Sequence, residues 1–416
     1  MDPDYGYRPS VASKNRDQGE IWIYLAFSGG GTRAAALAYG VLEGLRDTEI
    51  VVDGQKMRLL DEVDSLSGVS GGSFPAAYYA LFEDRIFDEF EERFLRRNVQ
   101  SALTWRILNP WNLLRLATPY LSRSEIASNY YSDNVFDHAT FADLAGAKGP
   151  RAYINATDLP SGFNFRFSQE AFDVICSDLN QLKISWAVAA SSAVPALLSP
   201  VTLKNYAGTC GYEPPEWFHE ALASRASNPR GWRTANSVAP FMDADQKKFI
   251  HLIDGGISDN LGVRAPLDRI ATIGGIEKSL RLSGMTPPDH LVIIVVNAET
   301  EPDPGIDLSS AAPSLAASMN LVSGSQIRRY NFESLLLIQS SVQDFAEQLT
   351  RHGHPVKGRV VEVSFDLLED EEERRYFKRL PTSFSLEEEQ VDRLIEVGQR
   401  LLKKSPEFQE LIEELR

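Results

Sequence analysis

Cysteine is scarce in this sequence, with only Cys176 and Cys210 among 416 residues. Two cysteines exclude both a multi-cysteine zinc site and a fold held together by many disulfides. Isolated thiols in a chain of this length are more often buried or tolerated than paired. We therefore expect free thiols, and a disulfide only if the protein resides in an oxidising compartment.

Long hydrophobic runs are missing as well. No uninterrupted apolar stretch approaches the ~18 to 20 residues that span a bilayer, and the first ten residues, Met1 to Ser10, are polar. We expect a chain without a signal peptide that is soluble or peripheral to a membrane. The cellular compartment stays open, because removal of a leader would leave the same sequence.

Basic residues are outnumbered by acidic ones, 42 against 58, which gives a formal net charge of -16. This charge repels polyanions, so nucleic acid is not an expected partner. Anionic lipid is also repelled at long range, and any membrane contact has to be apolar or locally basic. The remaining composition, 43% hydrophobic and 10% aromatic, is ordinary for a globular protein.

Short apolar segments that end in glycines and alternate with helical patterns run along the chain. Residues 21–27 predict a strand that enters a glycine turn and a helix over 33–46, and residues 63–69 repeat this arrangement before a helix over about 74–82. Further strands are predicted at 152–155, 163–167, 249–253, 291–297 and 360–365. Apolar strands that alternate with helices are typical of an α/β fold with a mainly parallel sheet covered on both faces.

The domain organisation follows from these elements. We expect an N-terminal segment over 1–20, a main domain over 21–300 and a helical extension over 301–416 that packs on the same core. Residues 83–143 form a long helical insertion, and insertions of this kind are often lids. Residues 208–245, rich in proline, predict a loop, and Ser385 with Glu388 predicts a capping box at the start of the last helical region.

Within the insertion, tryptophans and leucines alternate with two arginines: Trp105, Arg106, Trp111, Leu113, Leu114, Arg115 and Leu116. Such a segment suits a surface that admits a lipid chain or touches a bilayer. Aromatic residues at helical spacing are more often part of a core. Both interpretations stay open at the level of sequence.

A G-x-S-x-G segment spans Gly68 to Gly72 and places Ser70 where a strand turns sharply into a helix. Glycines beside the serine avoid the clash that side chains would create in a turn tight enough to expose its hydroxyl. The N–H of Gly71, the residue after the serine, can donate to an oxyanion. The segment therefore predicts Ser70 as a nucleophile, with Gly68 and Gly72 in support.

A second glycine segment, Gly29, Gly30 and Gly31, precedes Arg33 and follows the first strand. It offers unobstructed backbone N–H groups of the kind that form an oxyanion hole. A phosphate-binding loop is the alternative, but the segment lacks the Lys-Ser/Thr pair of a P-loop, and Ala34 stands where a dinucleotide motif has its last glycine. A purely structural glycine turn is a third possibility, and we favour the oxyanion hole.

A carboxylate followed by two glycines, Asp254, Gly255 and Gly256, ends another apolar strand. The carboxyl ends of strands in parallel sheets are where active sites collect their groups. An isolated Asp-Gly pair is more commonly a turn or cap. The sequence alone leaves both roles open for Asp254.

In this order, the three segments resemble the three signatures of the patatin-like phospholipase family. Residues 155–158 and 189–195 are similar to intermediate segments of that family, so the resemblance covers about Ile23 to Leu267 and leaves the C-terminal third without a motif. It implies a three-layer α/β/α fold and a Ser-Asp dyad that hydrolyses lipid acyl esters without a metal or other cofactor. Ala34 departs from the final glycine of many members.

The resemblance also implies individual roles. Ser70 would be the nucleophile and Asp254 the base, with the Gly29 to Gly31 amides as the oxyanion hole and Arg33 fixing the glycine loop. Gly255 and Gly256 would support the carboxylate. The expected function is hydrolysis of acyl esters in phospholipids or lysophospholipids, and protein partners stay open.

Histidine decides between this dyad and a catalytic triad. His251 lies three residues before Asp254, so strand alternation points the two side chains to opposite faces, and His290 lies at the strand edge away from the site. His352 or His354 would complete a Ser-Asp-His triad in an α/β-hydrolase-like esterase. Because desolvation raises the basicity of a carboxylate, a dyad is adequate without histidine. A third alternative is an inactive lipid-binding protein of the same fold.

Overall fold

The computed structural model describes residues 5–8, 20–52, 54–116, 122–194, 197–302, 304–308, 310 and 312–415. Most of the expected N-terminal segment, 1–20, lies outside these residues, as do 117–121 of the helical insertion and Pro195. The division into three parts stays a prediction.

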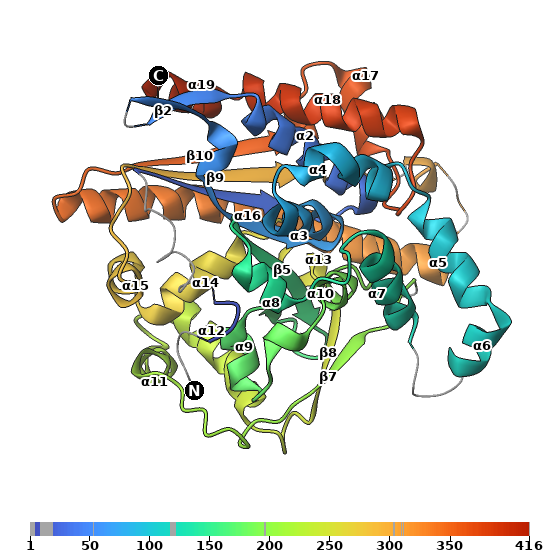
Figure 1. Cartoon of the computed structure of the whole chain (residues 1–416), viewed down its shortest axis with the longest axis horizontal. Helices are drawn as coiled ribbons and strands as arrows, with labels where there is room; N and C mark the ends of the chain where they lie inside the picture. The colour runs from blue at the N-terminus through green and yellow to red at the C-terminus, as the bar shows by residue number, and fades with distance from the viewer. Residues whose placement is uncertain are drawn as a thin grey trace.

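One eight-stranded sheet forms the centre of the fold, with the strand order β10-β9-β1-β4-β5-β8-β7 and β6 paired to β5 (Figure 1). The strands from β10 to β5 are parallel, whereas β8, β7 and β6 pair antiparallel. The bounds are β1 Ile21–Phe27, β4 Val63–Val69, β5 Arg151–Asp158, β6 Asn164–Arg166, β7 Val201–Lys204, β8 Phe249–Asp254, β9 His290–Asn297 and β10 Lys357–Ser364. All seven predicted strands are present in this sheet, whereas its strand β7 was not predicted.

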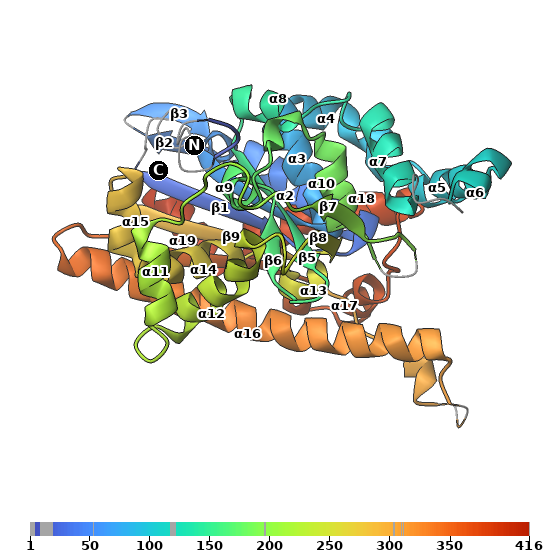
Figure 2. The ribbon, with the colours of Figure 1, turned by 90° about the horizontal axis from the view of Figure 1, so that it is seen from below.

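Both faces of the sheet are buried, which explains why its strands are apolar throughout. In β1, Ile23 and Leu25 face the core shared with helices α2 (Gly31–Arg46) and α18 (Glu388–Lys404). The intervening residues Tyr24 and Ala26 face the core shared with α14 (Arg264–Ile273) and α16 (Leu315–Arg351). Figure 2 shows α16 running along one side of the sheet. The predicted three-layer α/β/α fold is confirmed.

The remaining helices fill these two outer layers and the insertion. They are α3 Ser73–Phe82, α4 Arg85–Phe90, α5 Val99–Leu108, α6 Pro110–Leu116, α7 Arg123–Asn134, α8 Phe141–Gly146, α9 Gln169–Val174, α10 Ile184–Ser191, α11 Glu216–Ala223, α12 Pro229–Val238, α13 Gly256–Asp259, α15 Ile276–Ser283, α17 Glu371–Lys378 and α19 Pro406–Glu414. A separate hairpin consists of β2 (Glu49–Val52) and β3 (Gln55–Arg58). The described part of residues 83–143 is helical, as predicted.

Two local predictions were wrong. Residues 208–245 contain α11 and α12, because Pro215 and Pro229 stand at the starts of these helices and do not break them. At the start of a helix the N–H that proline lacks has no partner within the helix. The last helical region has Glu387 at its N-cap, and its capping box pairs Glu387 with Gln390. Ser385 is held in the preceding turn, where its N–H donates to Ser383.

The cysteine expectation was also wrong, since Cys176 and Cys210 form a disulfide. The N–H of Tyr206 donates to the carbonyl of Ile175 at 3.1 Å, which brings the two segments together. Their Cα atoms lie 5.5 Å apart, within the range that a disulfide spans. This long-range approach is not visible in the sequence.

In the part of the chain that the structure describes, no helix has the length and apolar character needed to cross a membrane.

Candidate active site

Ser70 lies in the sharp turn between β4 and α3, as the sequence predicts. Its φ is +50°, a left-handed conformation that non-glycine residues rarely adopt and that often marks a functional position. A Cβ atom on Gly68 would lie 2.5 Å from Cα of Ser73, and one on Gly72 would lie 2.5 Å from the carbonyl oxygen of Phe27. Only glycine therefore fits at positions 68 and 72, two residues before and two residues after Ser70.

The Ser70 hydroxyl donates a hydrogen bond of 2.7 Å to Oδ2 of Asp254. The pair is nearly closed off from water, with Ser70 4% and Asp254 8% exposed. Strand pairing explains the contact: Asp254 pairs with Ala156, and the neighbouring Asn155 pairs with Val69, directly before Ser70. The expectation that Asp254 ends a parallel strand was wrong, because β8 runs antiparallel to β5, yet its register brings the carboxylate to the same edge.

Burial controls the chemistry of Asp254. Loss of water contact raises the pKa of Asp254 to about 6, while hydrogen bonds from Ser70 and from the N–H of Gly256 act in the opposite direction. The Gly256 N–H donates to Oδ1 at 2.8 Å, so each carboxylate oxygen has one donor. A Cβ atom on Gly255 would lie 2.3 Å from the carbonyl oxygen of Asn155, and this glycine is therefore required for the close packing below Asp254.

The glycine loop lies beside Ser70, but its amides are not equivalent. The N–H of Gly29 donates to the carbonyl of Asn260 at 3.1 Å. This amide is therefore already engaged, and the prediction that Gly29 donates to an oxyanion was wrong. No hydrogen bond to another described residue engages the N–H groups of Gly30, Gly31 or Gly71. A Cβ atom on Gly71 would lie 2.0 Å from the carbonyl oxygen of Gly31, so the two glycine segments are in direct contact.

The side chain of Arg33 holds the glycine loop in place through hydrogen bonds. Its guanidinium donates to the carbonyls of Ala298 and Leu380 at 2.9 and 2.8 Å and to Oγ1 of Thr382 at 3.0 Å. Burial lowers the pKa of Arg33 to about 10, which leaves it charged at neutral pH. The adjacent N–H of Thr32 donates to the carbonyl of Ser383 at 2.9 Å. Arg33 thus connects the glycine loop to the C-terminal third of the chain.

The family model described as "Patatin-like phospholipase" matches residues 25–267, more than half of the chain. The chain belongs to the patatin-like phospholipase family. No curated protein matches the sequence.

Solved structures similar to this patatin-like chain include human GIVD cytosolic phospholipase A2, at 11% identity and a TM-score of 0.45, over 98% of this chain and 62% of that chain. The same human enzyme in complex with methyl gamma-linolenyl fluorophosphonate matches at 12% identity and a TM-score of 0.44, over 98% and 61%. VipD from Legionella pneumophila matches at 11% identity and a TM-score of 0.28, over 91% and 67%. The chain thus spans about 62% of the human phospholipase chain.

Three residues that the sequence did not single out hold the patatin-like site together. Ser191, at the end of α10, accepts the N–H of Ser70 at 2.8 Å on its hydroxyl and the N–H of Gly255 at 3.0 Å on its carbonyl. Thr157 donates to the carbonyl of Asp254 at 2.8 Å. Asn260 holds Gly29, as described above. Ser191 and Thr157 had a sequence signal, since they lie in the family segments 189–195 and 155–158, whereas Asn260 had none.

The histidines of a possible triad lie elsewhere. His352 and His354 precede β10, whose first residue, Lys357, pairs with His290 at the start of β9. These positions are at the amino ends of parallel strands, whereas Ser70 follows the carboxyl end of β4. His251 contacts Thr202 at 2.9 Å. In the described ranges no histidine is hydrogen-bonded to Asp254, and the α/β-hydrolase-like triad is not supported.

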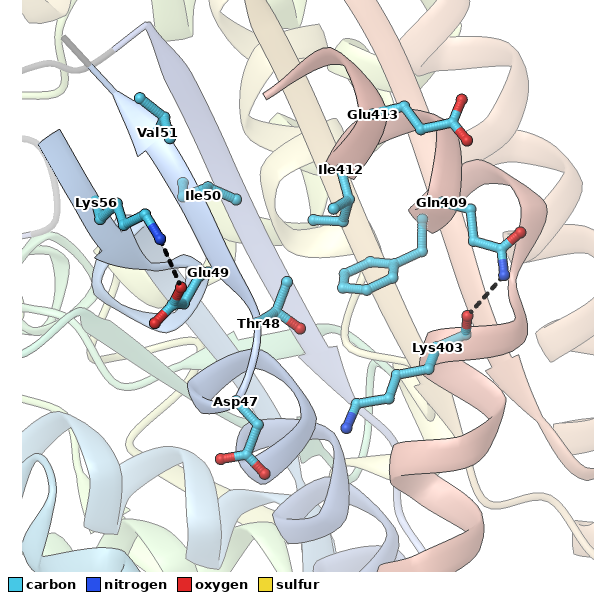
Figure 3. Close-up of a pocket in the computed structure, with 11 residues that line it drawn as sticks. Asp47, Thr48, Glu49, Ile50, Val51, Lys56, Lys403, Gln409, Ile412 and Glu413 are labelled. Atoms are coloured by element: carbon cyan, nitrogen blue, oxygen red, sulfur yellow. Dashed lines mark hydrogen bonds and ion pairs between the residues drawn. The ribbon is translucent and has the colours of Figure 1, made fainter. Parts of the chain in front are cut away.

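No described group of three or more histidine, cysteine, aspartate or glutamate side chains is arranged to hold a metal ion. An open groove of about 770 Å³ lies between the β2–β3 hairpin and α19, lined by residues that include Glu49, Lys56, Lys403 and Ile412 (Figure 3). It begins at Asp47 and Thr48, directly after the C-terminal end of α2. Because the glycine loop lies at the other end of α2, the groove is not part of the site.

Proposed function

We propose that this protein is a metal-independent serine hydrolase of lipid acyl esters, with Ser70 as nucleophile and Asp254 as base. The observation that carries the proposal is the 2.7 Å hydrogen bond from Ser70 Oγ to a buried Asp254 carboxylate. A nucleophilic hydroxyl next to a positioned base is the arrangement that covalent acyl transfer requires. Membership of the patatin-like phospholipase family favours lipid esters as the substrate class.

In the first half-reaction, Ser70 Oγ attacks the ester carbonyl carbon while its proton passes to Asp254 Oδ2. The oxyanion that forms is stabilised by the open N–H groups of Gly30, Gly31 and Gly71. The intermediate then expels the alcohol, which takes the proton from Asp254 and leaves an acyl group on Ser70. In the second half-reaction, water loses a proton to Asp254 and attacks the acyl-enzyme. The intermediate then releases the carboxylic acid, and Ser70 Oγ takes the proton back from Asp254.

The pKa of Asp254, about 6, suits this work. A carboxylate with an ordinary pKa near 4 is a weak base, whereas a base whose pKa approaches the operating pH both accepts and returns a proton efficiently. A bound acyl chain removes further water from the pair and raises the basicity again. The same burial that makes Asp254 costly to ionise therefore makes it useful.

We further propose phospholipids or lysophospholipids as substrates and the α5–α6 segment as the lipid-contacting surface and lid. Trp105 and Trp111 are 77% and 76% exposed, and Leu114 is exposed beside them, so these residues are not core. Arg106 is turned toward the protein, over the ring of Tyr130. With a net charge of -16, contact with a neutral, zwitterionic lipid surface through apolar side chains is favoured over anionic lipid.

The proposal is tested by labelling with a fluorophosphonate and by product analysis. We expect Ser70 to be the labelled residue and Ser70→Ala to abolish both labelling and hydrolysis of mixed phospholipids and lysophospholipids. Asp254→Asn preserves the shape but removes the base, so turnover should fall by ~10² to 10⁴. Ser340→Ala and Asp344→Asn, exposed substitutions on α16, are matched controls that should retain full activity.

Two outcomes would contradict the proposal. A folded protein that neither reacts with the probe nor releases fatty acid would be a lipid-binding protein of this fold. A folded Asp254→Asn variant with nearly full activity would exclude Asp254 as the base.

A further inference from the structure

A partly open cavity of about 250 Å³ lies on the face of the sheet covered by α14, α15 and α16. Figure 2 shows these three helices together on that side of the sheet. The cavity reaches Trp22 and Tyr24 of β1 and Ser65 of β4. Ser65 lies five residues before Ser70, or roughly 15 Å along an extended strand, so the cavity is separate from the candidate active site.

Most of the cavity wall is apolar. Trp22, Ile270, Leu280, Leu291 and Phe345 contribute to it from β1, α14, α15, β9 and α16. A wall of this kind excludes small inorganic anions as the main occupant, because it offers them no compensation for lost water. It suits a hydrocarbon chain.

The polar part of the wall carries a surplus of positive charge. Three arginines, Arg151, Arg166 and Arg269, line the cavity together with one carboxylate, Asp64. Asp64 accepts the N–H of Ile23 at 2.8 Å. The three arginines and one acidic residue, Glu170, all act electrostatically on the hydroxyl of Tyr153, which also lines the cavity, so these charged groups lie around one region of it.

Two of these arginines, Arg166 and Arg269, have no short hydrogen bond to a carboxylate among the described residues. The guanidinium of Arg166 donates to the backbone carbonyl of Ala265 at 3.2 Å, a neutral acceptor. Arg269 lies 3.8 Å from Glu170, longer than a direct hydrogen bond. A planar guanidinium presents paired donors that match a carboxylate. The cavity thus combines an apolar chamber with a carboxylate-binding end.

We propose that this cavity is a second lipid site, which binds the anion of a free medium-chain fatty acid with its carboxylate at Arg166 and Arg269 and its chain against Trp22 and Leu280. The proposal does not depend on the activity of Ser70. A volume of 250 Å³ holds about eight groups of the size of a water molecule, at ~30 Å³ each. Octanoate, with eight carbons, matches this size.

The binding test uses 8-bromooctanoate, because bromine quenches indole fluorescence on contact and Trp22 lines the cavity. We expect saturable quenching in the full-length protein and its loss in Trp22→Phe. The neutral analogue 8-bromooctanol should bind at least tenfold more weakly, since it lacks the charge that the arginines recognise. Quenching that persists in Trp22→Phe would place the ligand elsewhere and overturn the proposal.

Two further variants test the two ends of the cavity. Arg166→Gln should lower the affinity for 8-bromooctanoate at least tenfold and leave the affinity for 8-bromooctanol unchanged. The control Arg351→Gln, at an exposed end of α16, should bind both compounds as the wild type does. Ser279→Phe fills the chamber and should abolish both. If Arg166→Gln does not fold, two other results decide the question: the ratio of the wild-type affinities for 8-bromooctanoate and 8-bromooctanol, and the binding measured in Ser279→Phe. Equal affinities for acid and alcohol, or wild-type binding in Ser279→Phe, would exclude the site.

Discussion

Ser70 and Asp254 form a pair whose properties come from their surroundings. The left-handed backbone of Ser70 aims its hydroxyl at Asp254, and the packing of Gly68, Gly72 and Gly255 leaves no space for any side chain in the turns that hold them. Ser191 accepts hydrogen bonds from the backbone N–H groups of Ser70 and of Gly255, the residue after Asp254. A hydroxyl and a carboxylate that would be ordinary in water are thereby held at a fixed distance with little solvent.

The pH dependence of hydrolysis follows from the raised pKa of Asp254. Asp254 must be ionised to take the proton from Ser70, so kcat/KM on a soluble short-chain ester should rise with pH and level off above a midpoint near 6. A histidine base would give a midpoint in the same range, so the profile is measured also in His352→Ala and His354→Ala. We expect both variants to keep the wild-type profile. A midpoint near 4 would mean that Asp254 is not desolvated in the working enzyme.

At the scale of elements, α2 is the helix on which the site and the C-terminal extension meet. Its first residues carry the glycine loop, and its middle packs against α18 so closely that a Cβ atom on Gly40 would lie 2.1 Å from the carbonyl oxygen of Ile395. A Cβ atom on Gly398 of α18 would lie 2.6 Å from the carbonyl oxygen of Leu37. Two helices in backbone contact position the glycine loop rigidly.

Gly40→Ala should therefore destabilise the protein by about 1 to 3 kcal/mol, because the added methyl group meets backbone that cannot move aside. The control is Gly324→Ala in α16, where the added Cβ meets only the flexible end of Arg328. That substitution should be neutral or stabilise the helix by up to ~1 kcal/mol. Urea unfolding of both variants checks the prediction, and equal midpoints would show that α2 and α18 can separate without cost.

The α5–α6 segment carries the second prediction at this scale. Replacement of Trp105 and Trp111 by glutamine should reduce hydrolysis of zwitterionic vesicles at least tenfold and leave hydrolysis of a soluble short-chain ester nearly unchanged. The reason is that only binding to a vesicle requires apolar contact with the lipid surface. Replacement of the exposed Leu308 and Phe332, which lie outside this segment, is the control. Equal loss on both substrates would assign the tryptophans a structural role instead.

At the scale of the whole molecule, the C-terminal third completes the core although it carries no motif of its own. It supplies the edge strand β10, the helices α16 and α18 on opposite faces of the sheet, and the acceptors that hold Arg33 and Thr32. Residues 301–416 thus contact the glycine loop directly. The family motifs alone do not make a closed site.

A protein truncated after residue 300 should accordingly fail to fold, because it exposes the apolar edge of β9 and one face of α2 to water. We expect insoluble or aggregated protein without fluorophosphonate labelling, compared with the full chain expressed in parallel. Measurement by size-exclusion chromatography and labelling is sufficient. A soluble, monomeric and labelled 1–300 protein would show instead that the main domain is independent of the extension.

The amino-acid sequence by itself determined the strand-turn-helix units around Ser70 and Gly29 to Gly31, and it identified Asp254 as the candidate carboxylate. These features are local: apolar runs predict buried strands, and glycines mark turns that no side chain could enter. The tertiary structure decided which groups meet. The antiparallel direction of β8, the Gly29 amide occupied by Asn260, the support from Ser191 and the Cys176–Cys210 disulfide all join segments far apart in the chain. Such contacts depend on how the chain returns to itself, and no local pattern encodes them.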